Sequence, residues 1–229
     1  MTTLYAPKVR AVLDRLFTES ALQEKAPPIL PREFSFITGS PQERSDALAA
    51  LYMPISARCG DLLYSLVRAS RPNTIVEFGT SFGISTIYLA AAVSDNGLGH
   101  IFGTELSAAK VMAARSNLVS AGLADKVTIL AGDALHTLRT IPGPIGLALL
   151  DGWKDMCLPV LKLLEPHLAP GALIVGDDIN QTAMASYLHY VRDSTNGYVS
   201  SAFPVDDGME ISCWSGHYSE AQSLGGALR

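Results

Sequence analysis

The sequence has no long hydrophobic run, few cysteines and no cluster of basic residues. No apolar stretch approaches the roughly 18 residues of a membrane span, and charges interrupt the apolar pattern of the N-terminal segment MTTLYAPKVRAVLDRLF. We therefore expect no signal peptide, no membrane contact and a cytoplasmic location. The three cysteines, Cys59, Cys157 and Cys213, are far apart and form no C-x-x-C motif, which indicates reduced thiols instead of a disulfide framework or a zinc site.

The composition is that of a globular protein without affinity for polyanions. The formal net charge of −5 argues against nucleic-acid binding, which depends on lysine and arginine contacts to phosphate. A chain of 229 residues, 48% hydrophobic and 17% charged, is long enough for one large domain with a buried core. We expect a single domain over residues 1–229 whose partner is a small molecule.

Two kinds of pattern follow each other along the chain. Residues 4–17 and about 42–70 have helical spacing, with Pro27, Pro28 and Pro31 between them, and predict a helical N-terminal cap over 1–70. From Asn73, short β-rich runs alternate with helical ones. The predicted strands are TIVEF, HIFGTEL, KVTIL, IGLALLD, GALIVGDD, YVSSAFPV and MEISCWSG.

This alternation predicts an α/β fold with a mostly parallel seven-stranded sheet and helices on both faces. The last two runs are separated only by Asp206, Asp207 and Gly208, so they predict a terminal antiparallel hairpin. The core should span residues 73–216, and residues 217–229 should form a loose tail.

Acidic residues stand at or near the ends of five predicted strands: Glu77, Glu105, Asp133, Asp151, and Asp177 with Asp178. In open parallel sheets, ligands bind at the carboxyl ends of the strands. Any one of these acids is explained equally well as the cap of the helix that follows. Five together favour a ligand site.

The segment VEFGTSFGIST carries two glycines, Gly79 and Gly83, after a strand. A dinucleotide site would have G-x-G-x-x-G, and here Glu77 stands two residues before the first glycine. A carboxylate near a pyrophosphate costs on the order of a few kcal/mol per charge pair at an effective dielectric near 20. S-adenosylmethionine, with a sulfonium, an amine and a ribose but no phosphate, fits instead. Glu105 should bind its ribose hydroxyls, and Glu77 orders the glycine turn or contacts the cofactor's amino group.

The stretches EFGTSFGIS, GTELSAA, AGLADKVTIL, LLDGWKDMCLP, GALIVGDD and DDGME closely resemble catechol O-methyltransferase and the related cation-dependent O-methyltransferases, from about Met53 to Gly216. The resemblance implies a Rossmann-like class I methyltransferase fold. It places Gly79, Ser81 and Ser85 at the methionine end of the cofactor and Asp133, Ala134 and Trp153 near the adenine. The complete set of implied cofactor residues is Met53, Ile55, Glu77, Gly79, Thr80, Ser81, Gly83, Ser85, Glu105, Leu106, Asp133, Ala134, Asp151 and Trp153.

The same resemblance implies a metal-assisted reaction on an aromatic diol. Asp151, Asp177 and Asp178 match metal ligands, and Lys154 matches the general base. Met53, Lys154, Asp178 and Glu210 match substrate-binding residues, with Glu210 at the second hydroxyl of the diol. Oxygen-only ligands suit Mg²⁺, which would lower the pKa of a phenol from about 10.

Two residues depart from the family pattern. Asp178 stands where the catechol enzymes have asparagine, which leaves Mn²⁺ and Ca²⁺ open as alternatives to Mg²⁺. Gly152 stands where relatives have a bulkier residue, which predicts a looser adenine contact.

Several alternatives stay open on the sequence. One is metal-independent methyl transfer to an oxygen or nitrogen nucleophile, and another is a non-catalytic module that senses S-adenosylmethionine. Lys154 fits a solvated helix start as well as a base, and Trp153 fits core packing. Whether the N-terminal helices join two chains in a homodimer is also undecided.

Overall fold

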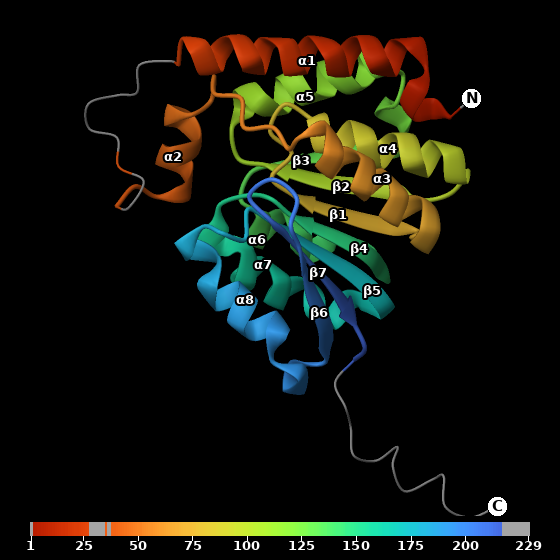
Figure 1. The fold of residues 1–229 in the computed structure, drawn as a ribbon, viewed down its shortest axis with the longest axis vertical. Helices are drawn as coiled ribbons and strands as arrows, with labels where there is room; N and C mark the ends of the chain where they lie inside the picture. Colours follow the sequence, from red (N-terminus) through yellow and green to blue (C-terminus); the bar gives the residue numbers. More distant parts are fainter. Residues whose placement is uncertain (1, 28–34, 36–37, 217–229) are drawn as a thin grey trace, which may run out of the picture.

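A seven-stranded sheet forms the centre of the computed structural model, which describes residues 2–27, 35 and 38–216 (Figure 1). The strands are β1 (Thr74–Phe78), β2 (His100–Glu105), β3 (Val127–Ala131), β4 (Ile145–Leu150), β5 (Leu168–Asp177), β6 (Tyr198–Phe203) and β7 (Met209–Trp214). Their order is β3-β2-β1-β4-β5-β7-β6, and β7 runs antiparallel to both β5 and β6. The predicted sheet, with its terminal hairpin, is confirmed.

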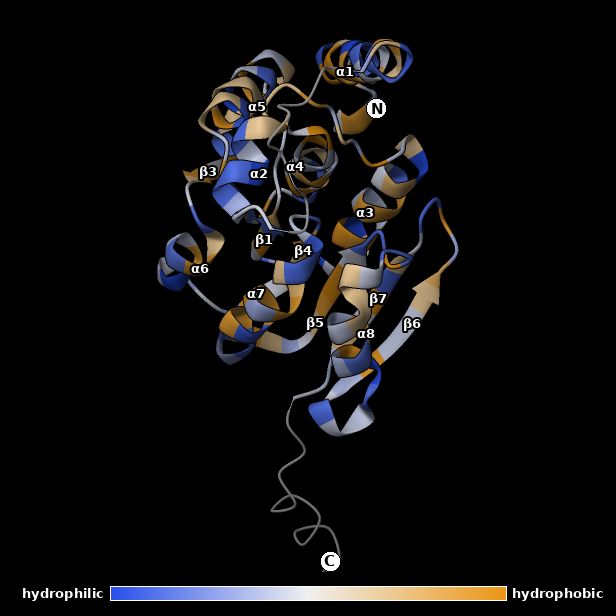
Figure 2. Ribbon diagram, turned by 90° about the vertical axis from the view of Figure 1, so that its left-hand side faces the viewer, coloured by the Kyte–Doolittle hydropathy of each residue, from blue (hydrophilic) through white to orange (hydrophobic). Residues whose placement is uncertain are grey.

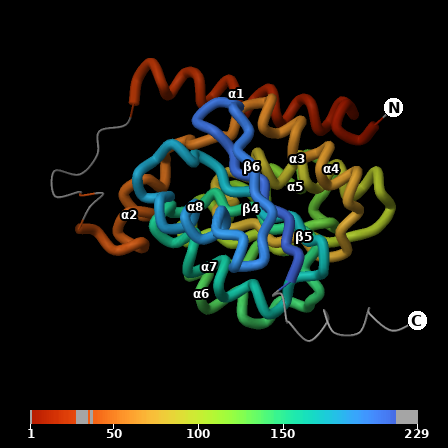
Figure 3. The backbone as a smooth tube through the Cα atoms, turned by 60° about the horizontal axis from the view of Figure 1, so that its bottom comes forward, coloured from red at the N-terminus to blue at the C-terminus, as the bar shows by residue number. Residues whose placement is uncertain are grey.

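Helices cover both faces of this sheet. They are α1 (Pro7–Lys25), α2 (Pro41–Ala47), α3 (Ala57–Ser70), α4 (Ile84–Asn96), α5 (Ala108–Ala121), α6 (Ala134–Thr137), α7 (Cys157–Leu164) and α8 (Ala185–Arg192). Helices α3, α4 and α5 lie on one face with α1 across them, and α6, α7 and α8 lie on the other (Figures 1 and 3). The fold therefore has the predicted α/β layers.

Each face of the sheet has its own apolar core. Along β1, Ile75 belongs to the core under α4, whereas its neighbours Val76 and Phe78 belong to the core under α7, because successive side chains of a strand point to opposite faces. Helices such as α1 and α3 carry both hydrophobic and hydrophilic residues (Figure 2), whereas α4 is buried along nearly its whole length. Burial of both faces explains why the central strands β1 and β4 are nearly continuous apolar runs, whereas the edge strands β3 and β6 are partly exposed.

The N-terminal region differs from the predicted pattern. The helical spacing over about 42–70 is not one helix: α2 ends at Ala47 and α3 begins at Ala57, after the N-cap residue Ser56. Between them, Pro54 disfavours a continuous helix, and the segment runs along the ligand pocket. Pro28, Pro31 and the predicted tail 217–229 lie outside the described residues.

The strand order places a crevice between β1 and β4. From β1 the chain proceeds outward to β2 and β3, then returns to β4 on the other side of β1. At this switch point the loops after the two strands diverge and leave room for a ligand. Within the described ranges, none of the helices is both long and apolar enough to cross a membrane.

Candidate active site

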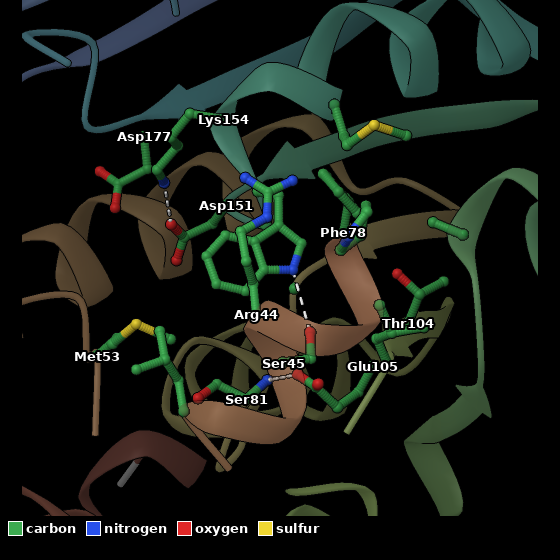
Figure 4. Close-up of a pocket in the computed structure, with 18 of the residues that line it drawn as sticks. Arg44, Ser45, Met53, Phe78, Ser81, Thr104, Glu105, Asp151, Lys154 and Asp177 are labelled. Carbon is green, nitrogen blue, oxygen red and sulfur yellow. Dashed lines mark hydrogen bonds and ion pairs between the residues drawn. The ribbon is translucent and has the colours of Figure 1, made fainter. Parts of the chain in front are cut away.

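A pocket of about 670 Å³ opens at the carboxyl ends of the parallel strands (Figure 4). Its walls come from α2, from residues 53–55 and from the segments after the five parallel strands β1 to β5. The predicted residues that line it are Met53, Ile55, Gly79, Ser81, Glu105, Leu106, Asp133, Ala134, Asp151, Trp153, Lys154, Asp177 and Asp178. Thr80 and Ser85 line a smaller adjoining cavity together with Gly79 and Ser81.

The turn after β1 requires glycine at position 79. Gly79 has φ +100°, and a Cβ there would stand 2.7 Å from the backbone of Asp151. No other residue fits between the two loops, because a side chain would meet fixed backbone atoms. Gly83, at φ +88°, starts α4 and lies outside the pocket lining. The predicted cofactor contact of Gly83 stays a prediction, and the structure gives Gly83 the N-cap position of α4.

Glu77 is fully buried beneath this turn. Its carboxylate accepts hydrogen bonds from Thr80 Oγ1 (3.0 Å), Ser85 Oγ (2.7 Å) and Thr86 Oγ1 (2.5 Å). Burial raises the pKa of Glu77 to about 7, although the three hydroxyls act in the opposite direction. Of the two roles open on the sequence, the geometry favours ordering of the glycine turn.

Ser81 and Glu105 form the part of the pocket suited to the cofactor. One oxygen of Glu105 accepts the N–H of Ser81 at 2.8 Å and the other accepts the N–H of Ser107 at 2.7 Å, which fixes the carboxylate (Figure 4). A carboxylate can accept further bonds from a ribose. Ser81 itself has φ +49°, and its buried hydroxyl has no hydrogen-bond partner among the described residues. A buried polar group without a partner in a pocket is expected where a ligand completes its bonding.

The acids after β4 and β5 converge at one end of the pocket. Carboxylate oxygens of Asp151, Asp177 and Asp178 all lie within 4.8 Å of one another. Lys154 Nζ stands 2.7 Å from Asp151 Oδ1 (Figure 4). The same atom lies 3.1 Å from Asp178 Oδ2. Asp178 has φ +55°, a left-handed conformation that aspartate and asparagine tolerate better than most residues.

The charges in this cluster perturb one another. Burial, followed by repulsion from Asp151, raises the pKa of Asp177 to about 8. Burial acts to lower the pKa of Lys154, but attraction to Asp151 and Asp178 outweighs it and raises that pKa above its ordinary value. One ammonium is too little positive charge for three ionised carboxylates, so Asp177 keeps a proton near neutral pH unless further positive charge is bound. Such an all-oxygen set fits a hard divalent cation such as Mg²⁺.

Helix α2 contributes residues that the sequence patterns did not indicate. The Arg44 guanidinium lies 4.6 Å from the centre of the Trp153 ring, and Trp153 Nε1–H donates to Ser45 Oγ at 3.0 Å. The S-x-x-E capping box that starts α2 is readable in the sequence, but it does not indicate which residues of the helix face a ligand. Lys110 and Gln181 also line the pocket, and no sequence motif indicated that either of them faces a ligand.

Gly152 packs against the ring of Phe78. A Cβ at position 152 would lie 2.6 to 2.8 Å from three ring carbons of Phe78, which is itself buried and lines the pocket. The space beside Gly152 is thus filled by an aromatic ring from β1. The prediction of a looser adenine contact did not consider this ring.

The structure does not bring Glu210 to the pocket. Glu210 is fully buried, accepts two hydrogen bonds from the Arg192 guanidinium (2.9 and 2.7 Å) and a third from Ser200 Oγ (2.7 Å). Strand alternation explains this: Asp177 pairs with Met209, so the next residue, Glu210, points to the opposite face, where α8 supplies Arg192. The predicted contact of Glu210 with a substrate hydroxyl is therefore corrected.

Comparison with known proteins agrees with this geometry. The family described as methyltransferase domain matches residues 76–179. Catechol O-methyltransferase of Mycobacterium tuberculosis is 33% identical over 136 residues, which cover 59% of this chain and 61% of that protein. Catechol O-methyltransferase B of Danio rerio is 29% identical over 178 residues, covering 72% and 66%. The match thus spans less than two-thirds of the length of either relative.

Solved structures share the fold over most of the chain. An O-methyltransferase from Bacillus cereus in complex with SAH has a TM-score of 0.65 at 20% identity, covering 88% of this chain and 99% of that one. TomG, an O-methyltransferase from Streptomyces achromogenes in complex with SAM, has a TM-score of 0.64 at 21% identity, covering 89% and 99%. Residues 76–179 thus match a methyltransferase domain, and the chain is similar in sequence to catechol O-methyltransferases and in fold to solved O-methyltransferases.

Proposed function

We propose that the protein is an S-adenosylmethionine-dependent O-methyltransferase that acts on a small aromatic molecule with two adjacent hydroxyl groups and uses a divalent cation, Mg²⁺ first among candidates. The observation that carries this proposal is the convergence of Asp151, Asp177 and Asp178 around Lys154 Nζ in the ligand pocket. A pocket that only bound the cofactor would not need three carboxylates and a buried lysine beside it.

The cofactor assignment is supported by the other half of the pocket. The Glu105 carboxylate suits two ribose hydroxyls, and the unpartnered hydroxyl of Ser81 suits a polar group at the methionine end. Acidic groups around the turn after β1 disfavour a pyrophosphate. S-adenosylmethionine has the matching pattern of charges, and relatives with this fold hold SAH and SAM.

The residues that line the pocket would then have separate roles in methyl transfer. A divalent cation, when bound, would offset most of the negative charge of the three carboxylates and lower the pKa of a phenolic hydroxyl. Beside that positive charge the Lys154 ammonium would release a proton to solvent, and the neutral Nζ would then accept the hydroxyl proton of the acceptor. The phenolate oxygen forms a bond to the methyl carbon as the carbon–sulfur bond breaks, leaving the methyl ether and S-adenosylhomocysteine. Met53 and Ile55 wall the pocket and help align oxygen, carbon and sulfur.

The test is transfer of a labelled methyl group from S-adenosylmethionine to a panel of catechols and single-hydroxyl phenols, each with Mg²⁺ and with excess chelator. We expect transfer to the catechols alone and its loss with chelator. Transfer that persists with chelator would favour the metal-independent reading. Cofactor binding without transfer to any acceptor would favour the sensing module.

Lys154→Ala tests the base within the same assay. Loss of a general base typically costs 10² to 10⁴ in rate, so we expect kcat to fall at least about 100-fold while the affinity for S-adenosylmethionine, measured by calorimetry, changes little. Lys162→Ala is the matched control, because Lys162 lies on α7 outside the pocket lining and its half-exposed side chain pairs with Glu165. Full activity in Lys154→Ala would show that Lys154 is not the general base.

A further inference from the structure

Two consecutive residues of α2 hold the loop that carries Lys154. Arg44 Nη1 and Nη2 bind the two oxygens of Asp155 at 3.2 and 3.0 Å, and Ser45 Oγ accepts the indole N–H of Trp153 at 3.0 Å. Figure 4 shows Arg44 and Ser45 within the pocket. Trp153 and Asp155 are the residues immediately before and after Lys154, so α2 holds the proposed base on both sides.

The Arg44 side chain is unusually buried and fixed in orientation for a charged residue. Its side chain is only 10% exposed, whereas Asp155 is 51% exposed. An arginine is buried in this way when its planar fork finds a carboxylate and its flat face finds an aromatic ring, and Arg44 has both. Its Nε is also buried with no hydrogen-bond partner among the described residues. Such a position restricts the guanidinium to one orientation and, through it, restricts Trp153 and Asp155.

Simple docking of α2 would not require this arrangement. The helix is seven residues long, too short to be stable alone, but its capping box and the buried Leu48 already hold it. An apolar residue in place of Arg44 could cover the Trp153 ring equally well. What the guanidinium adds is a directional contact with Asp155, and hence with the backbone turn in which Met156 N–H donates to Trp153 C=O at 2.8 Å.

We propose that Arg44, assisted by Ser45, is a positioning residue for methyl transfer. It acts through Trp153 and Asp155 to keep Lys154 Nζ directed at the carboxylates and to keep the indole ring in the cofactor part of the pocket. The inference rests on the proposed function, because it assigns Arg44 to the same site. It also makes the N-terminal region, through α2, part of the catalytic geometry.

The experiment compares Arg44→Met, Arg44→Lys, Asp155→Asn and the double variant Arg44→Met/Asp155→Asn in the purified full-length protein. Small displacements of catalytic groups can cost up to about 100-fold in rate, and we expect kcat to fall about tenfold in Arg44→Met with less than a threefold change in acceptor KM. Arg44→Lys should restore part of the loss, since an ammonium still pairs with Asp155. The double variant should be no slower than Arg44→Met alone, because both changes remove one contact.

Tryptophan fluorescence supplies a readout that does not depend on turnover. Trp153 is one of two tryptophans in the chain, and loss of the Arg44 or Ser45 contact should shift emission to longer wavelength in Arg44→Met and in the milder Ser45→Ala. Arg10→Met is the matched control: Arg10 pairs with Asp14 on the exposed side of α1, so activity and emission should stay at their unchanged values.

The outcomes separate the two proposals. Unchanged kcat and unchanged emission in folded Arg44→Met and Ser45→Ala would overturn the positioning role, even if the protein is an active methyltransferase. If the unmodified protein transfers no methyl group, the proposed function fails and the positioning role in catalysis fails with it. If Arg44→Met does not fold, Ser45→Ala and Asp155→Asn carry the test. Normal tryptophan emission in both, with losses of kcat that simply add when the two changes are combined, would also overturn the positioning role.

Discussion

At the scale of single residues, Glu210 has a different position in the structure from the one that the family resemblance implies. Its carboxylate is buried and bound to Arg192 and Ser200, away from the pocket. We expect Glu210→Gln to leave acceptor KM within about twofold and to lower the free energy of unfolding by about 2 kcal/mol, since a charge-assisted buried network is weakened. Steady-state kinetics and urea denaturation measure the two effects. A large rise in acceptor KM with unchanged stability would instead support a contact between Glu210 and the substrate.

Gly152 gives a second prediction at this scale. In Gly152→Ala the new Cβ must displace the buried Phe78 ring, and overpacking of this kind typically costs about 1–3 kcal/mol. Urea denaturation should show this loss, and Phe78→Leu in the same chain should recover part of it by making room. Gly97→Ala serves as a comparison without steric contact, since nothing lies within 4 Å of a Cβ at position 97, although its φ of +68° carries a backbone cost of its own. Equal stability of Gly152→Ala and the unmodified protein would contradict the packing argument.

At the scale of elements, Glu77 joins β1 to the start of α4. In the folded protein its pKa is about 7, against an ordinary value of 4.5, so the folded state keeps a proton that the unfolded chain releases between those pH values. The free energy of unfolding should therefore fall as pH rises from about 4.5 to 7, by at most about 3 kcal/mol from this group.

Glu77→Gln tests this sign directly, because glutamine does not titrate. Denaturation at pH 5 and pH 7.5 should show a smaller loss of stability with rising pH in Glu77→Gln than in the unmodified protein. Asp177, whose pKa is raised to about 8, contributes a similar slope to both proteins, so only the difference between them is attributed to Glu77. Identical slopes would show that the Glu77 carboxyl does not hold its proton in the fold.

At the scale of the whole molecule, the carboxylate cluster should link metal binding to global stability. A cation that binds only the folded state at 100 times its Kd stabilises it by about 3 kcal/mol. We expect Mg²⁺ to raise the Tm and chelator to reverse this, measured by calorimetry without cofactor or acceptor. Asp178→Asn removes one of the three charges and should reduce the shift, whereas Asp125→Asn, at an exposed position, should not. A Tm insensitive to Mg²⁺, Mn²⁺ and Ca²⁺ would contradict the metal site.

Most of the architecture was predictable, since strands buried on both faces must be apolar and amphipathic helices must alternate with them. The exception is instructive. Residues 42–70 keep a helical spacing of apolar positions, yet the chain leaves the helix after Ala47. Pro54 disfavours a continuous helix, but the spacing of apolar residues does not show that the segment between the two helices lines the pocket.

The sequence by itself determined the layered α/β fold and the acidic strand ends, because hydrophobic periodicity and parallel pairing place those residues at one edge. Only the tertiary structure decided which acids meet. Asp151, Asp177 and Asp178 share a pocket, whereas strand alternation turns Glu210 toward Arg192. It also brought Arg44 and Ser45, more than 100 positions before Trp153, to the loop of the proposed base. Such contacts depend on how distant segments pack in space, and neither spacing nor composition encodes that packing locally.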